Sequence, residues 1–242
     1  MKYLIDTHTH TIVSGHAYTT LLENVKCAAD KGLKMMADTE HGPAMPGGPS
    51  IIYFGNLKVI PRIIYGVYVL RGVEANIMDY DGKLDMPAER LKKLDLVIAS
   101  LHDICLKPGS RDENTRALIN AMDNKYVDII GHPGNPAFKI DIDAVVKAAK
   151  QKNVLIEINN SSFVTSRIGS YDNCLKIAQK AKEFGAQIVI GSDAHICFSI
   201  GEFEKADHII KEAGIEDDMI MNTSPERFKK YLHDKGKLLD VE

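Results

Sequence analysis

The side chains best suited to chemistry gather near the start of the chain, in the segment LIDTHTHT at residues 4–11. A short apolar run ends there in Asp6, His8 and His10, which occupy every second position. Because a β-strand sends every second side chain to the same face, a strand over residues 3–8 would present one carboxylate and two imidazoles together. Burying this trio without a partner is unfavourable, so the spacing indicates that water or a cation shares that face.

Most of the other histidines also follow short apolar runs. Two of the nine, His208 and His233, lie in helical patterns, where we expect them to be solvated. The other seven lie at or just after the end of a predicted strand: His8, His10, His16, His41, His102, His132 and His195. A single histidine at a strand end is usually structural. Seven on one rim, together with carboxylates, form the ligand set that divalent transition metals prefer.

Acidic residues accompany these histidines. Glu74 ends the third apolar run, and Asp193 lies in the segment GSDAH. A carboxylate has two oxygens, so Glu74 is suited to bridge two ions. We expect Asp6 and Asp38 to hold ring nitrogens of neighbouring ligands in place rather than to bind metal themselves.

The elements that must position these side chains alternate between strand and helix. The predicted strands are the apolar runs at 2–6, 33–38, 67–75, 94–102, 127–132, 154–159 and 186–195. Amphipathic helical patterns lie between them, and in the segment YDNCLKIAQKAKEFG the final Gly185 is a natural helix stop. This alternation predicts a parallel sheet covered by helices, and seven units favour a closed or distorted barrel. In such a barrel the C-terminal strand ends converge on one face, where the active site lies.

Composition limits the possible classes of protein. The 242 residues are 45% hydrophobic and 26% charged, with a net charge of −3, which is typical of one globular domain over residues 1–242. Four scattered cysteines predict reduced thiols, and Cys197 is expected to be a buried thiol rather than a zinc ligand. Neither a signal peptide nor a membrane-spanning run is visible, so we expect a cytoplasmic protein. Several apolar helix faces are compatible with a homo-oligomer.

The motifs resemble those of the PHP family, which is named after polymerase and histidinol phosphatase domains. The resemblance runs in order along the chain, ends with NTSPERF at 222–228, and is nearest to the small stand-alone bacterial PHP phosphatases. The segments that carry it are DTHTHT at 6–11, DTEH at 38–41, VEAN at 73–76, SLH at 100–102, GHPGN at 131–135 and GSDAH at 191–195.

This resemblance implies a distorted seven-stranded (β/α) barrel of the PHP type, with its metal site at the C-terminal ends of the strands. It also implies three divalent metal ions, most often zinc and in some members manganese or iron. The implied ligands form three groups, of which the first two share Glu74: His8, His10, Glu74 and Asp193; Glu74, His102 and His132; His16, His41 and His195.

Clustered ions of this kind suit phosphoryl chemistry. Ions about 3.5–4 Å apart clamp a phosphate and lower the pKa of a bound water toward about 7. The leading hypothesis is therefore a phosphatase in which metal-bound hydroxide hydrolyses a small phosphomonoester. The candidates for handling the leaving-group proton are Asp193, Asp6 and His195. The candidates for holding the phosphate are Lys107, Arg111 and Arg167.

Two rival hypotheses remain open at this point. A phosphodiesterase or 3′ exonuclease would need a basic track and aromatic platforms for a nucleic-acid strand, whereas this chain has a net charge of −3, 7% aromatic residues and no Trp. A non-catalytic, metal-dependent sensor would bind a phosphorylated metabolite without turnover. Catalytic metal sites keep an open coordination position, which a strand-end cluster beside the Gly/Pro-rich loop 41–50 favours.

The bridging role of Glu74 can be tested directly. Glu74→Gln should lose one or two ions and most of the activity, because an amide cannot bridge two cations as a carboxylate does. Elemental analysis of the purified variant, alongside its rate of turnover, measures both effects. Wild-type metal content together with a wild-type rate would contradict the assignment.

Overall fold

A computed structural model describes residues 1–164 and 166–237 of the chain. Except for β4, the strands that the apolar runs predict are shorter than those runs. The strands are β1 (Ile5–Asp6), β2 (Met35–Asp38), β3 (Ile63–Ile64), β4 (Val67–Asn76), β5 (Leu96–Ser100), β6 (Ile129–Ile130), β7 (Leu155–Asn159) and β8 (Ile188–Gly191).

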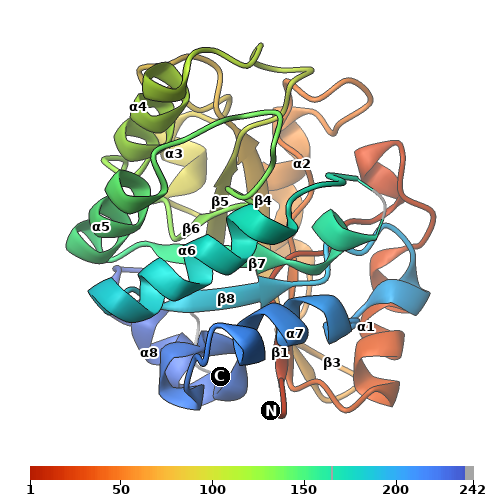
Figure 1. Cartoon of the computed structure of the whole chain (residues 1–242). Coiled ribbons are helices and arrows are strands. Elements are labelled where there is room, and N and C mark those ends of the chain that lie inside the picture. The colour runs from red at the N-terminus through yellow and green to blue at the C-terminus, as the bar shows by residue number, and fades with distance from the viewer. Residues whose placement is uncertain (165, 238–242) are drawn as a thin grey trace.

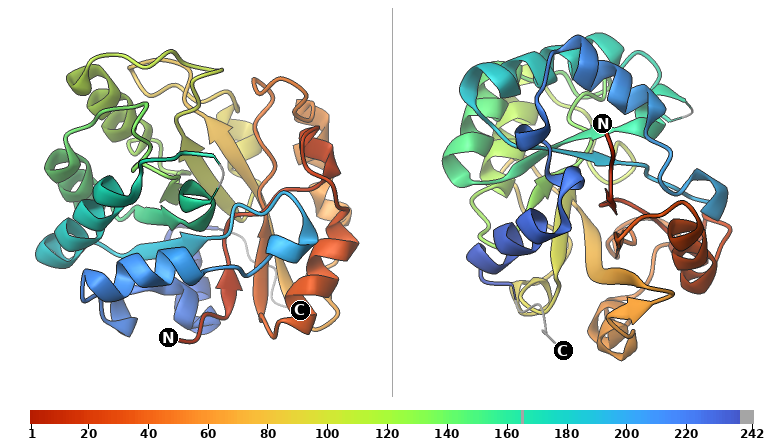
Figure 2. Two further views of the ribbon diagram at one scale, coloured as in Figure 1. Left: turned by 45° about the vertical axis from the view of Figure 1, so that its right-hand side comes forward. Right: turned by 90° about the horizontal axis from the view of Figure 1, so that it is seen from below.

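Seven of these strands form a nearly closed parallel barrel, in the order β1-β2-β4-β5-β6-β7-β8. Every neighbouring pair in this order is parallel, so all seven C-terminal ends open on the same side. Figures 1 and 2 show helices wrapped around the outside of this sheet. The expected distorted seven-stranded (β/α) barrel is confirmed.

The helices follow from local signals in the sequence. Thr20 with Glu23 and Ser110 with Glu113 form capping boxes at the starts of α1 and α4. Gly185 ends α6 in a left-handed conformation, as predicted. The α-helices are α1 (Leu21–Asp30), α2 (Ile51–Asn56), α3 (Ala88–Leu91), α4 (Arg111–Ala121), α5 (Ile142–Lys152), α6 (Tyr171–Phe184), α7 (Glu204–Glu212) and α8 (Pro225–Asp234).

The strands bury apolar side chains on both faces, as parallel strands of an α/β barrel must. Alternate residues separate into two clusters: Met35 and Leu70 point into the barrel, whereas Met36 and Val69 pack outward under the helices. The inner cluster also contains Phe228 of α8, which is fully buried. Because α8 fills the N-terminal end of the barrel, only the opposite end can hold a site.

A side chain fills the gap between the first and last strands. The Nδ2 of Asn222 donates to the carbonyl oxygens of Ile5 (2.9 Å) and Ile190 (2.7 Å), and its Oδ1 accepts from the Ile190 backbone N–H (2.7 Å). Asn222 is fully buried. One amide thus satisfies backbone groups of β1 and β8 that direct strand pairing would otherwise satisfy.

Two features of the strands add to what the sequence indicated. β1 ends at Asp6, where the apolar run 2–6 ends, and does not continue to residue 8, so Asp6, His8 and His10 do not share one face of a regular strand. The short strand β3 was not anticipated: it pairs antiparallel with β4 through a turn in which Tyr65 and Gly66 both have positive φ. Positive φ at both central residues marks a type I′ hairpin turn, and the Tyr-Gly pair between two β-branched runs was the available signal.

No helix in the described part of the chain is both long enough and apolar enough to span a bilayer.

Removal of the Asn222 amide should destabilise the barrel. Asn222→Ala leaves buried N–H and C=O groups of two strands without partners, so the free energy of unfolding should fall by about 2–4 kcal/mol. Urea denaturation measures the change. Asn120→Ala is the matched control, because the Asn120 amide makes one long bond of 3.5 Å to the Tyr80 carbonyl; it should change stability by less than about 1 kcal/mol. Equal effects for the two variants would contradict this role of Asn222.

Candidate metal centre

The barrel brings the predicted histidines together at its C-terminal end, above the inner apolar cluster. A cleft of ≈ 710 Å³ opens there, and its walls include His16, His41, His102 and His195. His208 and His233 lie on helices with side chains 68% and 83% exposed, as expected.

Glu74 lies at the centre of this cluster. Leu70 belongs to the inner cluster, and the period of two along β4 points Glu74 inward as well. The carboxylate is 1% exposed and faces five imidazoles. Its shortest nitrogen–oxygen distances are 2.7 Å to His41, 2.8 Å to His132, 3.3 Å to His8, 3.3 Å to His102 and 3.6 Å to His10.

Asp193 forms the second carboxylate of the cluster, on the loop that follows β8. Its Oδ1 lies 3.2 Å from His10 Nε2, 3.7 Å from His8 Nε2 and 3.6 Å from His195 Nδ1. Its Oδ2 accepts a hydrogen bond from Arg167. Asp193 therefore joins the buried histidines to a cation in the cleft wall.

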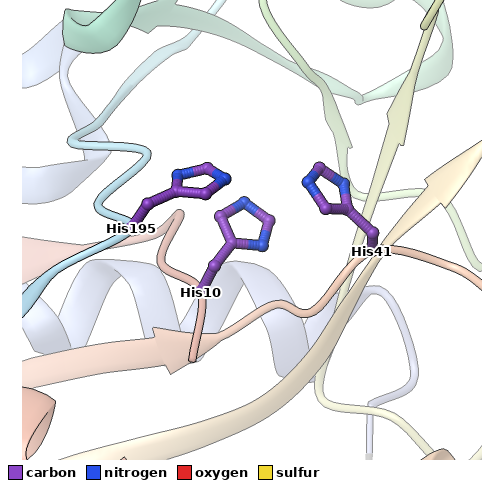
Figure 3. Close-up of side chains that lie close together, drawn as sticks. All are labelled: His10, His41 and His195. Atoms are coloured by element: carbon purple, nitrogen blue, oxygen red, sulfur yellow. The ribbon is translucent and has the colours of Figure 1, made fainter. Parts of the chain in front are cut away.

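His16, His41 and His195 also converge, although they come from three different loops. The His16 ring centroid lies 5.0 Å from that of His41 and 4.8 Å from that of His195. Figure 3 shows His10, His41 and His195 gathered at one point, with ring centroids of His10 4.3 Å from His41 and 4.5 Å from His195. All nine predicted ligands thus lie in one continuous cluster.

The chemistry of this cluster fits divalent metal ions. His41 Nδ1 and Glu74 Oε2 are buried and lack a hydrogen-bond partner, although they are 2.7 Å apart. Unsatisfied buried groups of this kind call for a further partner, and imidazole and carboxylate together suit transition metals. Three groups have ligand atoms within 4.8 Å of one another: His8, His10 and Asp193; His41, Glu74 and His102; His10, His41 and His195. Cys197 is in none of these groups and is a buried thiol, as expected.

Glu157 supports the cluster from below and was not identified from the sequence. Its Oε1 lies 2.7 Å from His8 Nδ1, and its Oε2 accepts the His132 backbone N–H at 2.8 Å. Asn76 has a similar role, because its Oδ1 lies 2.8 Å from His102 Nδ1. The signal for Glu157 was a carboxylate inside the apolar run VLIEIN, two residues after an inward-facing leucine.

Asp6 and Asp38 do not have the roles that the sequence suggested. The Asp6 carboxylate is fully buried and accepts from the backbone N–H groups of Ser192 (3.1 Å) and Gly201 (2.9 Å). Asp38 accepts from the Tyr53 hydroxyl at 3.0 Å. No bond of either carboxylate to a histidine ring is present among the described residues. Asp6 instead ties β1 to the loop after β8, and it does not line the cleft in which a leaving group would receive a proton.

The backbone around the cluster is unusual in two ways. Only glycine fits at position 191, because a Cβ there would lie 2.1 Å from Glu157 Oε1 and 2.6 Å from His8 Cβ. His132 and Asp193 have positive φ angles, 31° and 54°, which non-glycine residues seldom adopt. Strain of this kind persists where the surroundings fix the side chain, and here it falls on two predicted ligands.

The charges of the cluster act on one another. Burial disfavours the anion of Glu74, but the neighbouring His8, His102 and His41 outweigh burial and hold the pKa of Glu74 well below its usual range. Burial and the nearby His41 lower the pKa of His10. Burial, with Arg167 adding to it, lowers the pKa of His132 to about 4. Burial alone would lower the pKa of His8, but Glu157, Glu74 and Asp193 outweigh burial and raise it well above its usual value. Metal binding requires neutral imidazoles and ionised carboxylates, so binding of an ion at His8 would release a proton.

Of the three cations proposed to hold a phosphate, only Arg167 lines the cleft. It is anchored by Ser162 Oγ at 2.8 Å and Asn159 Oδ1 at 3.1 Å. Arg111 instead pairs with Asp141 at 2.6 Å on the outside of the barrel, and Lys107 is not part of the lining. The cleft does contain Lys205, which the sequence analysis did not single out.

Comparison with known proteins gives a consistent result. The model of the PHP domain family matches residues 6–161. A protein of Clostridium botulinum (strain Hall) named "Probable phosphatase" is 58% identical over 241 residues, covering 100% of this chain and 99% of its own. One of Thermoanaerobacter sp. (strain X514) with the same designation is 56% identical over 243 residues, covering 100% and 99%. The histidinol phosphate phosphatase of Lactococcus lactis, solved with zinc, L-histidinol and phosphate, has a similar fold (TM-score 0.58, 18% identity, 88% of this chain and 95% of that one).

The support given by Glu157 predicts weaker metal binding when it is changed. Glu157→Gln replaces one acceptor oxygen by a donor facing other donors, so zinc affinity should fall by about 10–100-fold. Competition with a chromophoric chelator measures the affinity. Asp95→Asn is the control, because Asp95 is equally buried (2% exposed) but pairs with Arg62 away from the ligands. Unchanged affinity in Glu157→Gln, or an equal loss in Asp95→Asn, would contradict the assignment.

Proposed function

This chain belongs to the PHP domain family, and from that premise we propose that it is a metal-dependent phosphatase that hydrolyses small phosphomonoesters at a trinuclear site. The observation that carries the proposal is the convergence of seven histidines, Glu74 and Asp193 on the floor and walls of one cleft. The buried unpartnered atoms His41 Nδ1 and Glu74 Oε2 support metal ligation. The names of the relatives support the type of reaction.

Three ligand groups would hold the ions, zinc being favoured by the number of imidazoles. The proposed groups are His8, His10, Glu74 and Asp193; Glu74, His102 and His132; and His16, His41 and His195. The ions would supply Lewis-acid charge that polarises the phosphoryl group and lowers the pKa of a water molecule. Glu74 would separate neighbouring cations and offset their charge, while Glu157 keeps His8 oriented from behind.

Arg167 is the residue of this chain best placed to bind the phosphate. Its guanidinium is fixed by Asn159, Ser162 and Asp193, and its side chain is 11% exposed on the cleft wall. Ser162 accepts from Nε, and Asn159 and Asp193 accept from Nη2, so the Nη1 N–H groups and the fixed positive charge remain to meet phosphate oxygens. Pre-orientation of these donors reduces the conformational entropy that is lost when substrate binds.

Asp193 and His195 remain the candidates for moving the leaving-group proton, because both line the cleft. Burial alone would raise the pKa of Asp193, but the charges of His8 and Arg167 outweigh burial and hold it well below its usual range. Asp193 is therefore an anion that accepts hydrogen bonds, and by itself it holds no proton to give to the leaving group. His195 is half-buried and directs Nδ1 toward the carbonyl oxygen of Asp193 (2.9 Å), which fixes the orientation of its ring.

The lining of the cleft argues against a nucleic-acid strand as substrate. Its long-chain cations are Arg167 and Lys205, and these alternate with Asp103, Glu202 and Glu204. Such a mixture does not form the basic track that a phosphodiester backbone needs. A small phosphorylated molecule fits the charge and the volume of the cleft better.

Release of inorganic phosphate tests the proposed function. The panel consists of p-nitrophenyl phosphate, nucleotides, sugar phosphates and histidinol phosphate, each with zinc, with manganese and after chelation. We expect release that depends on metal and is restored when metal is added back. Protein shown to carry its metals that releases no phosphate from any member would overturn the proposal, and binding without turnover in calorimetry would identify a sensor.

A further inference from the structure

A second hollow of ≈ 540 Å³ adjoins the metal cleft. It lies between α7 and the chain that runs from the 3-10 helix η3 (Asn160–Phe163) to the start of α6. The two hollows share a wall, because Glu204 and Lys205 line both of them. Figures 1 and 2 show α6 and α7 running side by side on the outside of the barrel. The second hollow therefore lies next to the metal cleft, with Glu204 and Lys205 between them.

Three rings line the second hollow. Phe163 and Tyr171 meet edge to face, with centroids 6.3 Å apart and planes at 71°. Tyr171 and His208 follow at 6.3 Å and 43°. The Tyr171 hydroxyl donates to Glu212, which fixes the ring, and the residue is still 39% exposed. A fixed and partly exposed aromatic surface is suited to stack a planar ligand.

The wall between the hollows is rigid and carries an available charge. Asn160 Oδ1 accepts the backbone N–H groups of Lys205 (3.0 Å) and Ala206 (3.1 Å), so a side chain of η3 caps the start of α7. The ammonium of Lys205 has no ion pair among the described residues, unlike that of Lys211, which pairs with Asp207 at 2.5 Å. His208 lies one helical turn beyond Lys205, about 5 Å farther along α7.

The combined space is far larger than a phosphate requires. The metal cleft alone holds ≈ 710 Å³, while a water molecule in the liquid occupies about 30 Å³ and a phosphate only a few times as much. The cleft and the adjoining hollow therefore leave room for a leaving group much larger than the phosphate. This inference rests on the proposed phosphatase function. We infer that the leaving group carries a planar aromatic ring, which stacks on Tyr171 in the second hollow. A spacer of about the size of a sugar passes Lys205 and joins this ring to the phosphate.

A matched pair of substrates tests this inference. Adenosine 5′-monophosphate and ribose 5-phosphate share the sugar and the phosphate and differ in the aromatic base. With the metal-loaded enzyme, kcat/KM for the nucleotide should exceed that for the sugar phosphate by about tenfold or more, given the usual strength of base stacking on an aromatic side chain. Tyr171→Leu should reduce this preference to within about twofold, and Tyr171→Phe, which keeps the ring, should retain it.

Tyr126→Leu serves as a control, because Tyr126 lies away from both hollows, where its carbonyl accepts from Lys237; it should leave the preference unchanged. Adenosine binding to the same variants by calorimetry provides a readout without turnover, and Tyr171→Leu should weaken it about tenfold. Equal kcat/KM values for the two substrates in the wild type, or a preference that survives in Tyr171→Leu, would overturn the inference.

A failure of the proposed phosphatase function can be distinguished from a failure of this inference. If neither substrate is hydrolysed by metal-loaded enzyme, the phosphatase proposal fails, and adenosine binding alone then decides the inference. Binding that is lost in Tyr171→Leu would still establish an aromatic subsite. Absence of binding in the wild type would overturn it.

Discussion

A carboxylate buried at the mouth of the barrel is the constraint on which the rest of this structure depends. Glu74 is 1% exposed, and its ionised form can persist there only if positive charge surrounds it. Five imidazoles from four different segments approach it, and the rings of His8 and His102 are oriented in turn by Glu157 and Asn76. Divalent ions between these groups would add the partner that Glu74 Oε2 needs, since among the described residues it accepts no hydrogen bond although His41 Nδ1 lies 2.7 Å away.

The architecture below the site serves the same requirement. Side chains that point into the barrel are apolar at the level of Leu70 and become polar at the level of Glu74 and Glu157, so the metal ligands lie directly above a dry core. Phe228 closes the other end of the barrel, which prevents water from reaching the cluster from below. Asn222 connects β1 to β8 with a side-chain amide, and thereby holds the loops that carry His8 and Asp193 together.

The hollows above the metal cluster are open to solvent, and their walls combine cationic, acidic and aromatic side chains. Arg167 is held against Asp193 by an ion pair, whereas Lys205, which has no ion pair among the described residues, lies between the metal cleft and the aromatic hollow. Binding of the phosphate requires a fixed charge such as that of Arg167. Binding of the leaving group requires a surface of matching shape, which the aromatic hollow would provide. The loops above the strands can therefore set the choice of substrate without disturbing the ligands below.

The sequence by itself determined the barrel and the identity of the proposed ligands. Apolar runs alternating with amphipathic helices leave few topologies, and parallel strands bring their C-terminal ends to one face, so His8, His41, His102 and His132 had to meet. The barrel and the gathering of these histidines were predictable because they depend on periodicity and on the order of elements, both of which are local or topological.

Only the tertiary structure decided which side chains support the ligands and which form the walls of the cleft. Asp6 was expected behind a histidine, but that place belongs to Glu157, which is 149 positions from His8 in the sequence. Arg167 could not be separated from Arg111 and Lys107 until the cleft was known, and the ring of Tyr171 belonged to an ordinary amphipathic helix. Contacts of this kind depend on side-chain direction and on packing between distant segments, which neither spacing nor periodicity encodes.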